Sequence, residues 1–263
     1  MKILRSIAAA FAMYSKFPVP QVEWTADTMA WALCCFPLVG AVIGLVLFAW
    51  LWLAAFLDLG VLLTAAVALL LPVALSGGIH LDGLCDTADA LGSHQSRERK
   101  LDILKDSRIG AFGMMTCALY LILFFAAWCQ TLPMGRQAML AAALVPVLSR
   151  GCSGLMAVTM PNARGDGLLA AFTQTVDLTM ARVILAVWVL LSGAAMIFVC
   201  PPAGVPAVCA AGLVVVYFRL LCRRQFGGIT GDLAGFFLQL CELSCILALA
   251  VFPGVWEVFQ RWF

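Results

Sequence analysis

The chain has 263 residues, of which 64% are hydrophobic and only 11% are charged, and its formal net charge is +2. Soluble domains carry about 25% charged residues, so this composition excludes an ordinary soluble protein. A net charge this small gives no indication of nucleic-acid binding. Several apolar runs reach the roughly 20 residues that cross a bilayer as a helix. We therefore predict an all-α, polytopic membrane helix bundle that forms one compact domain over residues 1–263.

Seven membrane spans and one surface helix are predicted along the chain. Residues 1–14 are too short to span a membrane and combine apolar side chains with Lys2 and Arg5, which indicates an amphipathic helix in the membrane interface. The apolar runs that follow predict spans at about 29–57, 61–75, 111–132, 139–160, 183–200, 205–221 and 233–252.

This layout places four polar segments at one membrane face: the N-terminal segment and residues 76–113, 161–182 and 222–232. Most of the Lys and Arg residues belong to that face, whereas the other face holds Arg136 and Arg261. Loops rich in Lys and Arg stay in the cytoplasm. We therefore predict that the four segments lie on the cytoplasmic side of a bacterial inner membrane.

Polar residues concentrate in the segment Ser76 to Gly113, which holds six of the fourteen acidic residues. Asp82, Asp86 and Asp89 follow one another there at i, i+4 and i+7, so a helix would place them on one face. Carboxylates so close repel each other unless a cation neutralises them, and Mg²⁺ prefers such oxygen ligands. We predict a Mg²⁺ site here, against the alternative of a solvated loop whose acids pair with the basic residues that follow.

Three further residues of this segment are candidate site residues. Asp106 comes four residues after Asp102, one helical turn, and is predicted to face the same metal. Arg108 is suited to binding a phosphate, because its planar guanidinium forms paired hydrogen bonds. For His80, direct metal ligation and a contact to substrate or to a metal ligand remain open.

A second polar segment ends in the run Gly227-Gly-Ile-Thr-Gly-Asp232, just before the last span. Glycines let backbone amides approach a ligand, and a helix N-terminus favours anions. Gly228, Thr230 and Asp232 are therefore predicted to bind substrate phosphate or metal.

Arg150 and Glu242 lie well inside predicted spans, where a charge is costly and marks function or pairing. The sequence leaves open whether the two side chains pair with each other or Arg150 reaches substrate phosphate. Both are candidate substrate-binding residues.

The same motifs resemble one known family. The run GGIHLDGLCDTADALGS, the later KDSRIGAFG and GGITGD, and Glu242 beyond them are similar to the cobalamin synthase family, whose members are adenosylcobinamide-GDP ribazoletransferases. The FPVP near the N-terminus, the FPLVG at Phe36 to Gly40 and Ser149-Arg150 extend the resemblance over nearly the whole chain. Ala90 departs from the family pattern, in which a glycine is expected after the third aspartate.

The resemblance implies a membrane-integral, Mg²⁺-dependent transferase that acts late in cobalamin biosynthesis, when the nucleotide loop is assembled. It would join adenosylcobinamide-GDP to α-ribazole, or to α-ribazole 5′-phosphate, and release GMP. Its partners would be these small molecules and membrane lipid, without nucleic acid. Mg²⁺ held by the predicted aspartates would bridge the diphosphate, and one aspartate or His80 would take the proton of the attacking ribose hydroxyl.

Two other interpretations are weaker. A phosphotransferase that uses a CDP-activated alcohol would also hold aspartates and Mg²⁺, but its DGxxAR pattern is not met after Asp82-Gly83. A secondary transporter would place its acids near mid-membrane and often has repeated halves, and no repeat is visible in the sequence. The sequence leaves open whether the acceptor is phosphorylated, which base it carries, which aspartate is the base, and whether the chain forms a homo-oligomer or associates with other corrinoid-assembly enzymes.

Overall fold

The computed structural model describes residues 2–29, 31–106, 108–165, 171 and 177–262. These residues form helices joined by short turns, with one isolated bridge between Asn162 and Ile229. In chain order the elements are α1 (Lys2–Tyr14), α2 (Ala26–Met29), α3 (Phe36–Phe56), α4 (Val61–Ser76), α5 (Ile79–Gly92), α6 (Arg97–Ile103), α7 (Ala111–Thr131), η1 (Leu132–Met134), α8 (Arg136–Thr159), α10 (Leu178–Val199), α11 (Pro201–Gln225) and α12 (Gly231–Trp262). The prediction of an all-α membrane bundle is confirmed.

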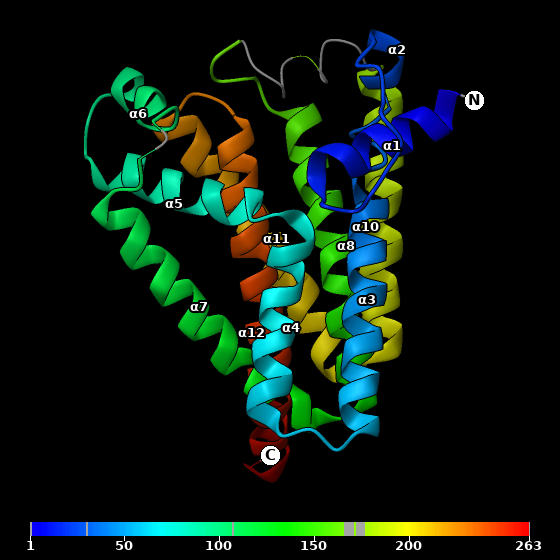
Figure 1. The fold of residues 1–263 in the computed structure, drawn as a ribbon. Coiled ribbons are helices and arrows are strands. Elements are labelled where there is room, and N and C mark those ends of the chain that lie inside the picture. Colours follow the sequence, from blue (N-terminus) through cyan, green and yellow to red (C-terminus); the bar gives the residue numbers. More distant parts are fainter. Residues whose placement is uncertain (1, 30, 107, 166–170, 172–176, 263) are drawn as a thin grey trace.

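Six of the described helices are long and apolar enough to cross a membrane: α3, α7 with η1, α8, α10, α11 and the first part of α12. The helices α4 and α5 meet the same criteria together but are bent by 92°. Figure 1 shows α4 running from the lower end of the bundle up to α5, which lies crosswise at the level where α4 ends and α7 begins. We therefore count α4 as the seventh pass and α5 as lying outside the spanning segments.

The right-angled turn between α4 and α5 depends on two glycines. Gly77 and Gly78 have φ angles of 68° and 77°, in the left-handed region that residues with a side chain rarely adopt. The side chain of Lys16 lies against Gly77, where it occupies the space that a Cβ would need. The glycine pair that opens the central motif therefore turns α5, with its aspartates, across the bundle.

The polar segments predicted to share a membrane face lie at the same end of the bundle. In Figure 1 α1, α5, α6 and the turn between α11 and α12 are at the upper end, where α8 also ends. The segment after α8 is joined to that turn, because Ala163 N–H donates to the Ile229 carbonyl and Ile229 N–H to the Pro161 carbonyl, each at 2.9 Å. The predicted order of passes requires these segments to share one end of the bundle, and the described residues agree with it.

The first span differs from its prediction. The sequence predicts a helix from residue 29, whereas α3 begins at Phe36 after the turns of residues 31–35. Pro37 lies in the first turn of α3. Proline has no amide hydrogen to donate to a preceding turn, so it begins a helix readily and cannot continue one from upstream.

Candidate active site

The candidate site lies where α5 crosses the beginning of α12. Gly83 of α5 lies directly against the backbone of Asp232, and a Cβ at Gly83 would be 2.5 Å from the Asp232 carbonyl oxygen. A side chain at Gly83 would therefore push the two helices apart. Because Gly83 directly follows Asp82, this close approach brings the carboxylates of α5 beside the first turn of α12.

Four carboxylates from two helices interact at this crossing. The pKa of Asp86 is raised to about 7, chiefly by its burial and then by the negative charges of Asp82, Asp232 and Asp89. Arg164 partly offsets this repulsion, and its Nη2 lies 3.5 Å from Oδ2 of Asp232. The crossing therefore concentrates negative charge beside the guanidinium of Arg164.

A cavity of about 260 Å³ opens at the crossing. Its polar lining includes His80, Asp82, Ser153, Asn162, Arg164, Thr230 and Asp232. Its apolar and aromatic lining includes Met13, Tyr14, Leu33, Phe36, Ile79 and Ala157, mostly from the N-terminal part of the chain. The cavity thus combines charged side chains with apolar, partly aromatic ones.

The charged side fits a divalent cation by the chemistry of its donors. In the described part of the chain, no three His, Cys, Asp or Glu side chains are gathered closely enough to form a complete metal centre. Mg²⁺ does not require one, because it is usually held by one or two carboxylates and completed by water and substrate phosphate. The repulsion that raises the pKa of Asp86 is the kind that a bound cation relieves.

Asp89, predicted as the third metal ligand, binds the beginning of α7. Its Oδ2 accepts a hydrogen bond from Gly110 N–H at 2.7 Å, and its Oδ1 accepts one from Gly113 N–H at 2.8 Å. The first amides of a helix lack partners within the helix, so this carboxylate satisfies two of them. Capping of α7 is the role that the geometry supports, and metal ligation by Asp89 stays a prediction.

Replacing Asp89 with alanine separates these two roles. We expect Asp89→Ala to lower the free energy of unfolding by about 1–2 kcal/mol, because it removes the cap of α7. Thermal unfolding in detergent would measure this loss, with Asp86→Ala as the matched control on the same helix. Asp86→Ala should not destabilise the fold, since it removes a repelled charge. An unchanged unfolding midpoint for Asp89→Ala, with weakened Mg²⁺ dependence of activity, would favour the ligand role instead.

Asp106 and Arg108 pair with each other away from the cavity. Arg108 Nε and Nη2 donate to the two carboxylate oxygens of Asp106 at 2.9 and 2.7 Å, and this hydrogen bonding lowers the pKa of Asp106 to about 2. The Arg108 side chain is 86% exposed. The helical spacing assumed for Asp102 and Asp106 does not hold, because α6 ends at Ile103. The structure therefore does not bring Asp106 to Asp82, and the roles of Asp106 and Arg108 remain predictions.

His80 lies at the inner side of the cavity. Its ring is buried, its centroid is 5.8 Å from that of Phe36, and its Nε2 has no hydrogen-bond partner among the described residues. Burial, and then the positive charge of Arg150, lower the pKa of His80 to about 3. An imidazole with so low a pKa is a weak base at neutral pH. Its position favours a hydrogen-bonding contact over the role of proton acceptor.

The glycine-rich segment before α12 divides into two parts. Gly228 lies against the segment after α8, where a Cβ would be 2.3 Å from the Pro161 carbonyl oxygen. The Thr230 hydroxyl accepts a hydrogen bond from Leu233 N–H and caps α12, and both Thr230 and Asp232 line the cavity. The predicted Thr230 and Asp232 are thus in the site, whereas Gly228 serves to dock the neighbouring segment.

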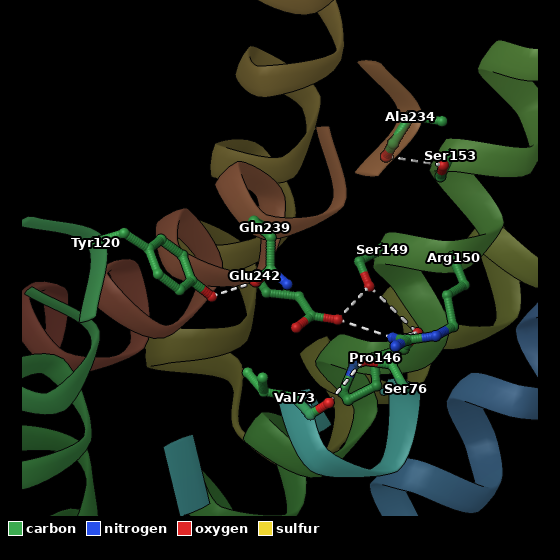
Figure 2. Close-up of polar contacts among 10 residues, drawn as sticks. All are labelled: Val73, Ser76, Tyr120, Pro146, Ser149, Arg150, Ser153, Ala234, Gln239 and Glu242. Atoms are coloured by element: carbon green, nitrogen blue, oxygen red, sulfur yellow. Dashed lines mark hydrogen bonds and ion pairs between the residues drawn. The ribbon is translucent and has the colours of Figure 1, made fainter. Parts of the chain in front are cut away.

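Arg150 and Glu242 form a buried ion pair between α8 and α12. Arg150 Nη1 donates to Glu242 Oε1 at 2.8 Å, and the Ser149 hydroxyl donates to the same oxygen at 2.9 Å (Figure 2). The two charged side chains are 1% and 5% exposed. The question left open by the sequence is therefore answered: they pair. Neither residue lines the cavity, so their predicted contact with substrate stays a prediction.

Another buried hydrogen bond runs from the Tyr120 hydroxyl of α7 to Gln239 Oε1 of α12 (Figure 2). The guanidinium of Arg150 also lies 5.7 Å above the ring centroid of Phe36, which in turn borders the cavity. The buried Arg150 thus packs against Phe36, a residue that lines the cavity.

Sequence reasoning missed Arg164, Asn162 and Tyr14 as site residues. In the sequence Arg164 is one of many Lys and Arg residues of the predicted cytoplasmic face, whereas in the structure its Nη2 lies 3.5 Å from Asp232 and donates to the Leu101 carbonyl at 3.1 Å. The available signal was the short polar run PNARGD directly after an apolar span. Tyr14 carried no signal, because aromatic residues are common in interfacial helices.

Comparison with known proteins places these features in one family. The family described as cobalamin-5-phosphate synthase matches residues 6–250. A protein of Lachnoclostridium phytofermentans named adenosylcobinamide-GDP ribazoletransferase is 40% identical over 255 residues, which cover 97% of each chain. Proteins of the same name from Pseudomonas aeruginosa and Mesorhizobium japonicum are 37% and 33% identical, over 94% and 95% of this chain and 98% and 94% of theirs. No solved structure matches the chain.

Proposed function

The chain belongs to the cobalamin-5-phosphate synthase family, and from this premise we propose that it is a membrane-integral adenosylcobinamide-GDP ribazoletransferase. The reaction would join adenosylcobinamide-GDP to α-ribazole, or to its 5′-phosphate, and release GMP. The observation that carries the proposal is the α5–α12 crossing, where Asp82 and Asp232 line one cavity with Arg164. A cluster of carboxylates and a guanidinium is suited to binding a diphosphate together with a divalent cation.

In this proposal Asp82 and Asp232, which line the cavity, would hold Mg²⁺, and the ion would supply neutralisation of the diphosphate charge and relieve the repulsion at the neighbouring Asp86. Arg164 binds a phosphate oxygen in exchange for its contact with Asp232. The ribose 3′-hydroxyl of the acceptor attacks the phosphorus on the corrinoid side. A bond forms between that oxygen and phosphorus, the bond to the bridging oxygen breaks, and GMP leaves with the bridging oxygen. A neighbouring carboxylate takes the hydroxyl proton.

The decisive experiment is GMP release by the purified protein in liposomes, given adenosylcobinamide-GDP and α-ribazole. We expect GMP and a matching cobamide with Mg²⁺ present, and a loss of at least about 100-fold with excess EDTA, since a metal ion contributes several kcal/mol to such transfers. Omitting the acceptor is the control for simple hydrolysis. Folded protein that releases no GMP with either form of acceptor, but releases CMP from a CDP-activated alcohol, would replace this proposal with the phospholipid-type transferase.

The site end of the bundle is proposed to face the cytoplasm, because most Lys and Arg residues belong to it. Figure 1 places the N-terminus at that end and the C-terminus at the other. An alkaline phosphatase fusion, which is active only outside the cytoplasm, should therefore be active at the C-terminus and inactive at the N-terminus. The reverse result would invert the orientation.

A further inference from the structure

The end of α1 forms part of the candidate active-site cavity, a role that the prediction of an interfacial helix does not include. Met13 and Tyr14 line the cavity together with Phe36 at the beginning of α3. The ring centroids of Tyr14 and Phe36 are 4.2 Å apart. The chain just after α1 is tied to the site, because Lys16 N–H donates to the Leu75 carbonyl at 2.7 Å, next to the turn that begins α5. An aromatic pair thus lines the same cavity as the carboxylates Asp82 and Asp232.

The charged and the aromatic side chains of the lining suit different parts of a substrate. Asp82, Arg164 and Asp232 suit a phosphate with its cation, whereas Tyr14 and Phe36 suit a flat apolar group. The volume of about 260 Å³ is at the small end for a ligand pocket. It suits a nucleoside-sized molecule, and a corrin ring carrying an adenosyl group and GDP is far too large for it.

Of the two nucleosides in the proposed reaction, the acceptor fits these apolar side chains better than guanosine. The base of α-ribazole is a dimethylbenzimidazole, which is flat, carries two methyl groups and has one free ring nitrogen. Guanine has polar atoms along two edges. These atoms would find no hydrogen-bond partners in the side chains of Met13, Leu33, Phe36 and Ile79. Polar groups buried without partners weaken binding.

We infer that Tyr14 and Phe36 form the subsite for the aromatic base of the acceptor nucleoside and so determine which bases are accepted. This inference rests on the proposed function. It places the ribose of the acceptor between the aromatic pair and the carboxylates, with its hydroxyl directed to the diphosphate. The first helix then contributes to the specificity of the enzyme.

The test compares Tyr14→Leu with Tyr14→Phe, which keeps the ring. We expect Tyr14→Leu to raise the KM for α-ribazole about 5- to 10-fold, because the loss of one aromatic contact weakens binding by about this factor. The KM for adenosylcobinamide-GDP should stay unchanged. Tyr14→Phe should stay within about 2-fold of the wild type. Tyr217→Leu is the matched control, because Tyr217 is an exposed tyrosine on α11 that does not line the cavity.

A second readout is independent of turnover. Binding of α-ribazole without donor, measured by equilibrium dialysis, should weaken in Tyr14→Leu by the same factor. The ratio of the affinity for α-ribazole to that for the riboside of unmethylated benzimidazole should also become smaller in Tyr14→Leu. The inference would be overturned if Tyr14→Leu changed only the KM for adenosylcobinamide-GDP, or if it behaved like Tyr217→Leu. In either case GMP release by the wild type would still support the proposed function. Absence of GMP release by the wild type would instead overturn the proposed function, and the dialysis would still decide whether Tyr14 contacts the base.

Discussion

Asp82→Asn should lower the rate of GMP release at least about 100-fold without lowering the unfolding temperature. Asp82 lines the cavity, and the adjacent Gly83 fixes it against the first turn of α12. Asparagine keeps the size of the side chain but removes the charge that would hold Mg²⁺, and electrostatic stabilisation of this kind accounts for about 10²–10³ in rate. The measurement is single-turnover GMP release at saturating Mg²⁺.

Asp58→Asn is the matched control for this substitution. Asp58 lies in the turn between α3 and α4 at the opposite end of the bundle, and its φ of 53° is one that asparagine also adopts. Its activity should equal that of the wild type. Unchanged turnover in Asp82→Asn would remove Asp82 from the metal site, and an equal loss in Asp106→Asn would return Asp106 to the predicted ligands.

Glu242→Gln should destabilise the bundle by about 3–5 kcal/mol, the cost of leaving one partner of a buried ion pair uncompensated. Arg150 would remain almost fully buried, with the neutral amide and the Pro146 carbonyl as its nearest acceptors. The expected result is a lower unfolding temperature in detergent and a smaller folded yield.

The double variant Arg150→Met, Glu242→Gln should recover part of this stability, because it removes the unpaired charge. Arg99→Met is a control, since the ion pair of Arg99 with Asp102 spans 3.9 Å on an exposed surface and surface pairs contribute little. A Glu242→Gln protein with normal stability but a raised KM for the corrinoid donor would contradict the structural role and restore the predicted substrate contact.

The sequence by itself determined the membrane class, the order of the apolar runs and the segments that supply the candidate site. Each apolar run is a local property, and the cost of placing polar backbone in lipid makes it a helix wherever it occurs. The spacing of Asp82 and Asp86 and the glycines around them are likewise local, and their resemblance to one family extended over most of the chain. The family could therefore be predicted from the sequence.

The tertiary structure decided which side chains meet. Asp89 caps α7 through amides 21 and 24 residues away, and Arg164 reaches Asp232 from the segment after another helix. Helical periodicity orders neighbours within one helix but carries no information on which helices cross. The partners of Glu242 and the placement of Tyr14 in the cavity therefore followed only from the packing of the bundle.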